Sequence, residues 1–272
     1  MNNFPEYVCP YAKRLAAKSP RFARQCYDLR SVNQTFKHSN NRTFELFSPD
    51  PFGELTHASK CPGLKQRFSD RVLVMTTELC FMCCRHCTRQ GLFGKTSVCR
   101  TDRDLQACVD YVKAHPKVRD VLLSGGDVLT LSDAKVMKFV NAFAKLPQVE
   151  IVRVCTRAPA ANPARITAKL ATALARSKKV WVNTQFNCAD EVTDEARAAA
   201  AKLVDRGVPV SCQTVLLSGV NDSGPEMLKL LKALSAARIR RPSSGRTATV
   251  IMLKRGVSSS LCRRMNPVIW RW

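Results

Sequence analysis

Five short runs of apolar, mostly β-branched residues recur along the middle of the chain and predict five β-strands. They cover residues 71–77, 120–123, 151–155, 180–183 and 210–217. The last four runs begin 31, 29 and 30 residues apart, which is the length of a strand followed by a helix. The first interval is longer because a cysteine-rich segment is inserted there.

The segments between these runs show the spacing of amphipathic helices. Apolar side chains fall on one face of residues 101–114 and 132–146, namely Leu105, Cys108, Val109 and Val112, and Val136, Phe139, Val140 and Phe143. Residues 194–206 are alanine-rich and are followed by Gly207 and Pro209, which are common helix stop signals. This alternation predicts an α/β fold with a parallel sheet, either open or closed into a barrel.

The distinctive polar motifs all follow predicted strands. They are CFMCCRHCTRQ at residues 80–90, SGGD at 124–127, TRAP at 156–159, NTQFN at 183–187, and Gln213 with GVND at 219–222. In β/α barrels the chemistry lies at the carboxyl ends of the strands, on the loops that follow them. We therefore expect the five motifs to share one site.

The charge of the chain is strongly positive but unevenly distributed. The formal net charge is +23, and residues 238–272 hold nine Lys or Arg and no Asp or Glu. Residues 13–42 hold eight Lys or Arg and one acid, Asp28. Since the excess lies in the end segments and aromatic residues make up only 7% of the chain, we expect no nucleic-acid partner. No run of about 18 apolar residues exists, so we expect a cytoplasmic chain without a membrane span.

The thirteen cysteines indicate reduced thiols and a metal site rather than a disulfide framework. Cys108, Cys155 and Cys212 lie within apolar patterns and are expected to be buried core residues. Cys80, Cys84 and Cys87 have the spacing C-x3-C-x2-C. Three thiolates on a short loop can bind three irons of a cubane cluster and leave the fourth open.

A structural zinc site is the alternative interpretation of this cysteine loop. Such a site usually has four protein ligands, and only Cys83 or His86 is available nearby. We interpret Cys83 as a bystander because its spacing fits poorly. A basic nucleic-acid-binding protein with a structural metal is the corresponding alternative function.

Beyond the spacing itself, the chain resembles the radical-SAM superfamily, and within it the lysine 2,3-aminomutase family. The resemblance covers about residues 50–240 and rests on RVLVMTTELCFMCCRHC (71–87), RDVLLSGGD (119–127), TRAP, NTQFN and QTVLLSGVND (213–222). It implies a partial (β/α)6 TIM-like barrel of the radical-SAM type, of which five strands are evident in the sequence and the sixth is not.

The resemblance also implies roles for single residues. Cys80, Cys84 and Cys87 match the ligands of a [4Fe–4S] cluster. Contacts with S-adenosyl-L-methionine (SAM) are implied for His86, Ser124, Gly125, Gly126, Asp127 and Gln213. Gln185 stands where lysine-specific members carry a histidine. Arg89 matches the arginine that pairs with the substrate carboxylate, and Arg67 and Arg71 resemble anchors for the phosphate of pyridoxal 5′-phosphate.

The implied activity is that of an amino-acid 2,3-aminomutase, an isomerase. It moves the α-amino group to the β-carbon through a 5′-deoxyadenosyl radical and a pyridoxal phosphate imine. The implied partners are an amino-acid substrate, an electron donor such as flavodoxin or ferredoxin, and a second copy of the chain. The alternative is a truncated or inactive radical-SAM protein that binds the cluster and SAM without aminomutase activity.

The two end segments depart from the family pattern. We divide the chain into an N-terminal extension (residues 1–49), a radical-SAM barrel (50–240) and a basic tail (241–272). The sixth strand is expected near residues 238–240, and the lysine that forms the Schiff base is not found, because Lys254 lies in surroundings that do not match. We therefore expect the chain as written to lack aminomutase turnover. Two basic, aperiodic segments beside a good match suggest frame-shifted reading, which a verified gene sequence would test.

The cysteine assignment makes a direct prediction. Changing Cys80, Cys84 or Cys87 to Ala is expected to abolish an oxygen-sensitive iron–sulfur cluster. Each is one of only three thiolate ligands, so the loss of one leaves two of the four irons without a protein thiolate. Cys83→Ala is the matched control and is expected to keep the cluster. Iron and sulfide content after anaerobic reconstitution measures both. Loss of the cluster in Cys83→Ala with retention in Cys84→Ala would contradict the assignment.

Overall fold

The computed structural model describes residues 9–26, 61–84, 86–87, 89 and 100–240 of the chain. Most of the predicted N-terminal extension, the first residues of the family match (50–60 of about 50–240), and the basic tail with Lys254 lie outside the described residues. The division into these three segments therefore stays a prediction.

The described residues form one six-stranded sheet with the strands in sequence order. The strands are β1 (Leu64–Phe68), β2 (Arg71–Thr77), β3 (Asp120–Gly125), β4 (Ile151–Cys155), β5 (Val180–Gln185) and β6 (Val210–Gln213). β2 to β6 pair in parallel, whereas β1 pairs with β2 antiparallel. Parallel neighbours need a crossover connection, and the helices between the strands supply it.

Successive side chains along each strand point to opposite faces of the sheet, and the two faces differ chemically. One face carries branched apolar side chains that are at most 3% exposed, namely Val72, Val74, Val121, Leu123, Val152, Val154, Val180, Val182 and Val210. The opposite face carries Leu73, Leu122, Cys155, Asn183 and Gln213, which line a cavity. Because side chains alternate along a strand, the first face builds the core and the second is left for a site.

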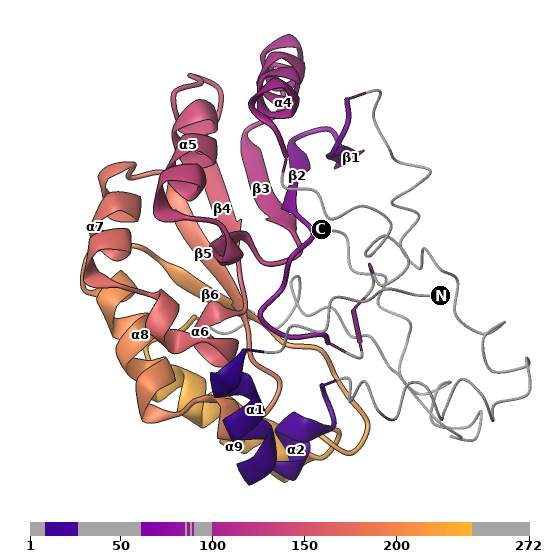
Figure 1. The fold of residues 1–272 in the computed structure, drawn as a ribbon, viewed down its shortest axis with the longest axis vertical. Helices are drawn as coiled ribbons and strands as arrows, with labels where there is room; N and C mark the ends of the chain where they lie inside the picture. The colour runs from indigo at the N-terminus through magenta and orange to yellow at the C-terminus, as the bar shows by residue number, and fades with distance from the viewer. Residues whose placement is uncertain (1–8, 27–60, 85, 88, 90–99, 241–272) are drawn as a thin grey trace, which may run out of the picture.

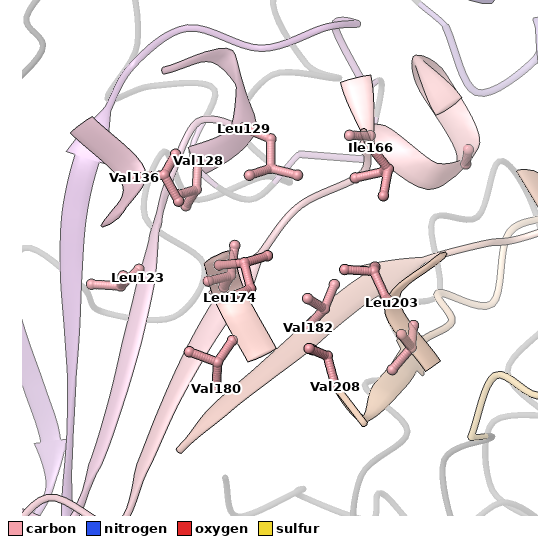
Figure 2. Packing of buried hydrophobic residues seen from close by; sticks show 14 of the residues in the cluster. Leu123, Val128, Leu129, Val136, Ile166, Leu174, Val180, Val182, Leu203 and Val208 are labelled. Carbon is pink, nitrogen blue, oxygen red and sulfur yellow. The ribbon is translucent and has the colours of Figure 1, made fainter. Parts of the chain in front are cut away.

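Helices cover the apolar face of the sheet (Figure 1). They are α4 (Asp102–Ala114), α5 (Asp133–Ala144), α7 (Ala168–Arg176), α8 (Asp194–Val204) and α9 (Gly224–Ala236). Four of them begin at a side-chain cap, supplied by Thr101, Ser132, Thr167 and Thr193. Figure 2 shows the packing beneath them, where Leu174 and Leu203 from the helices lie near Val180 and Val182 of β5.

Short elements complete the carboxyl edge of the sheet. They are α6 (Ala158–Ala161) and the 3-10 turns η3 (Val128–Thr130), η4 (Pro163–Arg165) and η5 (Ala189–Glu191). The N-terminal helices α1 (Pro10–Lys18) and α2 (Pro20–Ala23), with the residues that flank them, contact this edge. Cys9 N donates to Phe81 O over 2.9 Å, Tyr11 Oη lies 2.6 Å from Thr193 Oγ1, and Ser19 Oγ donates to Asp190 Oδ2 over 2.5 Å.

The structure confirms the predicted α/β class and the five predicted strands, with two corrections. β6 ends at Gln213, so residues 214–217 of the fifth apolar run are not strand. The sequence analysis also missed β1, because only its two end residues, Leu64 and Phe68, are apolar. Antiparallel pairing with β2 holds this strand instead of an apolar pattern of its own.

The expected sixth barrel strand is present only as its first residue within the described part of the chain. Arg240 forms a parallel bridge with Ser211, donating its N–H to Val210 O and accepting from Cys212 N, both over 2.9 Å. The position next to β6 is thus occupied where the strand was predicted to begin. Among the described residues, no helix is both long enough and apolar enough to cross a membrane.

The turn after β3 packs against the backbone that leads into the cysteine loop. Gly126 N donates to Thr77 O over 2.6 Å and Asp127 N donates to Leu79 O over 2.7 Å. A Cβ on Gly126 would lie 2.3 Å from Leu79 O, and Gly125 has a φ of +110°. The two glycines are therefore required for close approach of the chain to itself.

This crowding predicts the effect of a single methyl group. Gly126→Ala is expected to lower the free energy of unfolding by about 1–3 kcal/mol, because the backbone of the cysteine loop must move. Gly224→Ala is the matched control, since its Cβ would meet nothing within 4 Å, and it is expected to keep or slightly raise stability. Urea unfolding followed by circular dichroism measures both. Equal stability of the two variants would refute the packing argument.

Candidate functional site

All twelve residues that the sequence analysis singled out line one cavity of about 330 Å³. They come from β1, β2, the cysteine loop, β3 and its turn, and β6: Arg67, Arg71, Cys80, Cys84, His86, Cys87, Arg89, Ser124, Gly125, Gly126, Asp127 and Gln213. Thr156 and Arg157 after β4, and Gln185 at the end of β5, also line it. The cavity extends from β1 and the start of β2 to the carboxyl ends of the parallel strands, and its volume suits a small organic ligand.

The cysteine loop enters this cavity through Cys80, Cys84 and Cys87. Cys83 is buried and is not among the lining residues. Burial raises the pKa of Cys87 to about 12 and that of Cys80 well above its usual range. Without a cation these two thiols keep their protons, so metal binding there would release them.

Three other cysteines were expected in the hydrophobic core, and two of them lie there. Cys108 and Cys212 are buried within the hydrophobic core, as expected. Cys155 is only partly buried and lines the cavity, which corrects its assignment to the core. It is the last residue of β4 and lies on the cavity face of the sheet.

A cubane cluster and a single zinc ion make different demands on the cysteine loop. Within the described residues, no group of three or more His, Cys, Asp or Glu side chains is arranged to hold one metal ion. A tetrahedral zinc site requires its ligands to converge on one point. In a cubane cluster each thiolate binds a different iron, and the iron, sulfide and zinc contents of the reconstituted chain decide between the two.

Asp127 lies below the cavity surface and is 5% exposed. Its Oδ1 accepts from Leu129 N over 3.0 Å and from Thr156 Oγ1 over 2.5 Å, and its Oδ2 accepts from Arg157 N over 2.7 Å. Burial raises the pKa of this carboxyl, and the three hydrogen bonds oppose the rise. The carboxylate thus joins the turn after β3 to the loop after β4. Its contact with SAM stays a prediction.

His86 is held in one neutral form. Its Nε2 lies 2.7 Å from Gln185 Nε2, which is a donor, so the ring proton is on Nδ1. Burial, followed by the nearby Arg157 charge, lowers the pKa of His86 to about 3. Gln185 therefore contacts His86 directly, at the position where the sequence analysis found a departure from the family.

A buried polar network behind the cysteine loop was missed by the sequence analysis. Arg157, which is 7% exposed, pairs with the fully buried Glu191 over 2.9 Å. Gln25 Oε1 accepts from Arg157 Nη2 over 2.5 Å and from Asn187 Nδ2 over 2.9 Å. TRAP and NTQFN had marked Arg157 and Asn187 without giving them a role, and no pattern had marked Gln25 or Glu191.

The arginines of the cavity lie on two sides of it. Arg67 on β1 and Arg71 on β2 each hold a guanidinium carbon 5.7 Å from the Phe68 ring centroid. Arg89 Nη1 donates to Ser124 Oγ over 3.3 Å. The pair Arg67 and Arg71 is suited to bind a phosphate, and Arg89 is suited to bind a carboxylate. No role for Lys254 as the Schiff-base lysine follows, because it lies outside the described residues.

Two buried side-chain nitrogens, in residues that line the cavity, have no hydrogen-bond partner among the described residues. They are His86 Nδ1 and Arg157 Nε. A buried donor that lacks a partner costs about 1–3 kcal/mol, so such groups usually mark the place of a ligand, ion or water. Sulfide, carboxylate or purine acceptors would satisfy them, and the residues present therefore fit a [4Fe–4S] cluster with SAM.

Comparisons with known proteins agree with the motifs. Residues of this chain are 43% identical to an L-lysine 2,3-aminomutase from Acetoanaerobium sticklandii over 182 residues, which are 67% of this chain and 44% of that protein. The L-lysine 2,3-aminomutase of Fusobacterium nucleatum is 43% identical over 70% of this chain and 45% of its own length. A glutamate 2,3-aminomutase from Clostridioides difficile is 35% identical over 70% and 45%.

The chain thus spans less than half the length of these three relatives. No protein-family model matches it. A crystal structure of Streptococcus suis SuiB bound to precursor peptide SuiA superposes on 65% of this chain and 38% of its own, with a TM-score of 0.46 and 14% identity. The sequence relatives, together with the motifs that meet in the cavity, place the chain in the lysine 2,3-aminomutase family.

Proposed function

We propose that this chain forms the cluster- and SAM-binding part of an amino-acid 2,3-aminomutase. The observation that carries the proposal is the meeting of five separate motifs at one cavity, in a chain 43% identical to an L-lysine 2,3-aminomutase. When bound, the [4Fe–4S] cluster and SAM supply radical chemistry, and pyridoxal 5′-phosphate holds the migrating amino group. The protein positions these groups and keeps water away from them.

The cysteine loop would present three thiolates to the cavity that its residues line. Its backbone is held on both sides, because Leu79 O accepts from Asp127 N over 2.7 Å and Cys26 forms an antiparallel bridge with Cys84. Cys80, Cys84 and Cys87 would each bind one iron. The fourth iron would have no protein thiolate and would be open to the amino and carboxylate groups of SAM.

His86 would contact the nucleoside of SAM as a neutral donor. With its pKa lowered to about 3, the ring stays uncharged at neutral pH. Gln185 occupies Nε2 and leaves Nδ1–H for an acceptor in the cavity. Gln213 and the turn from Ser124 to Gly126 lie on the same cavity and would complete the SAM contacts.

The arginines that line the cavity would bind the anionic groups of the substrate and of pyridoxal 5′-phosphate. Arg89 is assigned to the substrate carboxylate, and Arg67 and Arg71 to the phosphate, where their cation–π contacts with Phe68 hold them beside each other. The relatives include lysine and glutamate enzymes, so the amino acid itself is left to experiment. A flavodoxin or ferredoxin would deliver the electron. Association with a second copy of the chain is also part of the proposal.

Anaerobic reconstitution with iron, sulfide and dithionite tests this proposal. The loaded chain is expected to cleave SAM to 5′-deoxyadenosine, and Arg89→Met is expected to keep that cleavage while losing any response to an added amino acid. Turnover of L-lysine or L-glutamate with pyridoxal 5′-phosphate distinguishes an aminomutase from a chain that only cleaves SAM. A chain that takes up zinc but no iron–sulfur cluster would overturn the proposal.

A further inference from the structure

The side chain of Arg157 runs from the end of β4 to the back of the cysteine loop. Its Nη1 donates to Cys84 Sγ over 2.9 Å. Arg157 is 7% exposed and its aromatic neighbour is Phe22 of α2, 5.9 Å from the guanidinium carbon. A buried cation therefore contacts one of the three proposed cluster ligands directly.

The rest of the guanidinium is fixed by groups that do not belong to the cysteine loop. Nη2 donates to Glu191 Oε2 over 2.9 Å and to Gln25 Oε1 over 2.5 Å. Glu191 Oε1 in turn accepts from Gln25 Nε2, Asn187 N and Cys188 N over 2.8–3.0 Å. Because every partner is itself held, Nη1 has little freedom to point elsewhere.

The backbone of Arg157 is anchored as well, through its N–H to the Asp127 carboxylate over 2.7 Å. An arginine that served only to neutralise Glu191 would need the Nη2 contacts alone. This arginine also directs Nη1 to sulfur, and its Nε is buried without an acceptor among the described residues. Nη1 is thus committed to Cys84 Sγ, while the rest of the side chain is held by groups outside the cysteine loop.

A hydrogen bond from a cation to a cluster thiolate acts on the cluster in two ways. It orients the ligand, and it stabilises the more negative, reduced state. We propose that Arg157 is a positioning residue that fixes the Cys84 thiolate and raises the reduction potential of the cluster, while Glu191 and Gln25 hold it in place. This inference rests on the proposed function, because it presumes a cluster on Cys80, Cys84 and Cys87.

The test compares reduction potentials of the full chain after anaerobic reconstitution, by redox titration followed with electron paramagnetic resonance. Arg157→Met alone would leave Glu191 buried and unpaired, so it is combined with Glu191→Gln. The double variant is expected to take up the cluster and to show a more negative midpoint potential. Glu191→Gln alone keeps the Nη1 contact and loses a nearby negative charge, so its potential is expected to be equal to or higher than that of the unaltered chain.

Arg165→Met is the matched control. Arg165 also follows β4 and is also mostly buried, but it donates to Leu129 O and Leu131 O over 2.7 and 2.8 Å and pairs with Asp133. Its removal is expected to leave the midpoint potential unchanged. A double variant that loads normally with an unshifted potential would overturn the inference and leave the proposed function intact. An unaltered chain that assembles no cluster would overturn both.

Discussion

The buried carboxylate of Asp127 is the contact on which the arrangement of the site depends. It accepts hydrogen bonds from its own turn through Leu129 N and from the next strand through Thr156 Oγ1 and Arg157 N. The N–H groups of Gly126 and Asp127 point the other way and hold the carbonyls of Thr77 and Leu79. One turn therefore fixes the ends of three neighbouring strands relative to one another, and with them the cysteine loop.

A second set of contacts extends this arrangement to the remaining strands. Arg157 and Glu191 connect the ends of β4 and β5, and Asn187 Oδ1 accepts from Val215 N after β6 over 2.8 Å. A buried ion pair of this kind contributes little net stability compared with apolar packing, but removing one partner is costly. Its value here lies in fixing the positions of loops that would otherwise have few apolar contacts.

The sequence predicted the strands whose side chains pack against the helices, because the core imposes a regular apolar pattern there. Residues 71–77 and 151–155 agree with β2 and β4 to the residue. β1 escaped prediction because Lys65, Gln66 and Arg67 interrupt its apolar positions. The start of the sixth barrel strand at Arg240 is a single bridge, which no periodicity could reveal.

For a related physical reason, some residues of the site could be predicted from the sequence and others could not. Motifs with unusual local composition, such as the cysteine loop and SGGD, can be recognised along the chain. Gln25 and Glu191 are ordinary polar residues, 166 positions apart, that meet only in the folded chain. The close approach of Gly126 to Leu79 likewise joins segments that are far apart in the sequence, and only the folded chain reveals it.

The central claim is that this cavity holds a cubane cluster by three thiolates, with one iron left for SAM. Mössbauer spectroscopy of the chain loaded with iron-57 tests it most directly, before and after addition of SAM. The account predicts that SAM changes the signal of a single iron of the cluster and leaves the others unchanged. A spectrum that SAM does not alter, or iron bound only as isolated thiolate-coordinated ions, would contradict it.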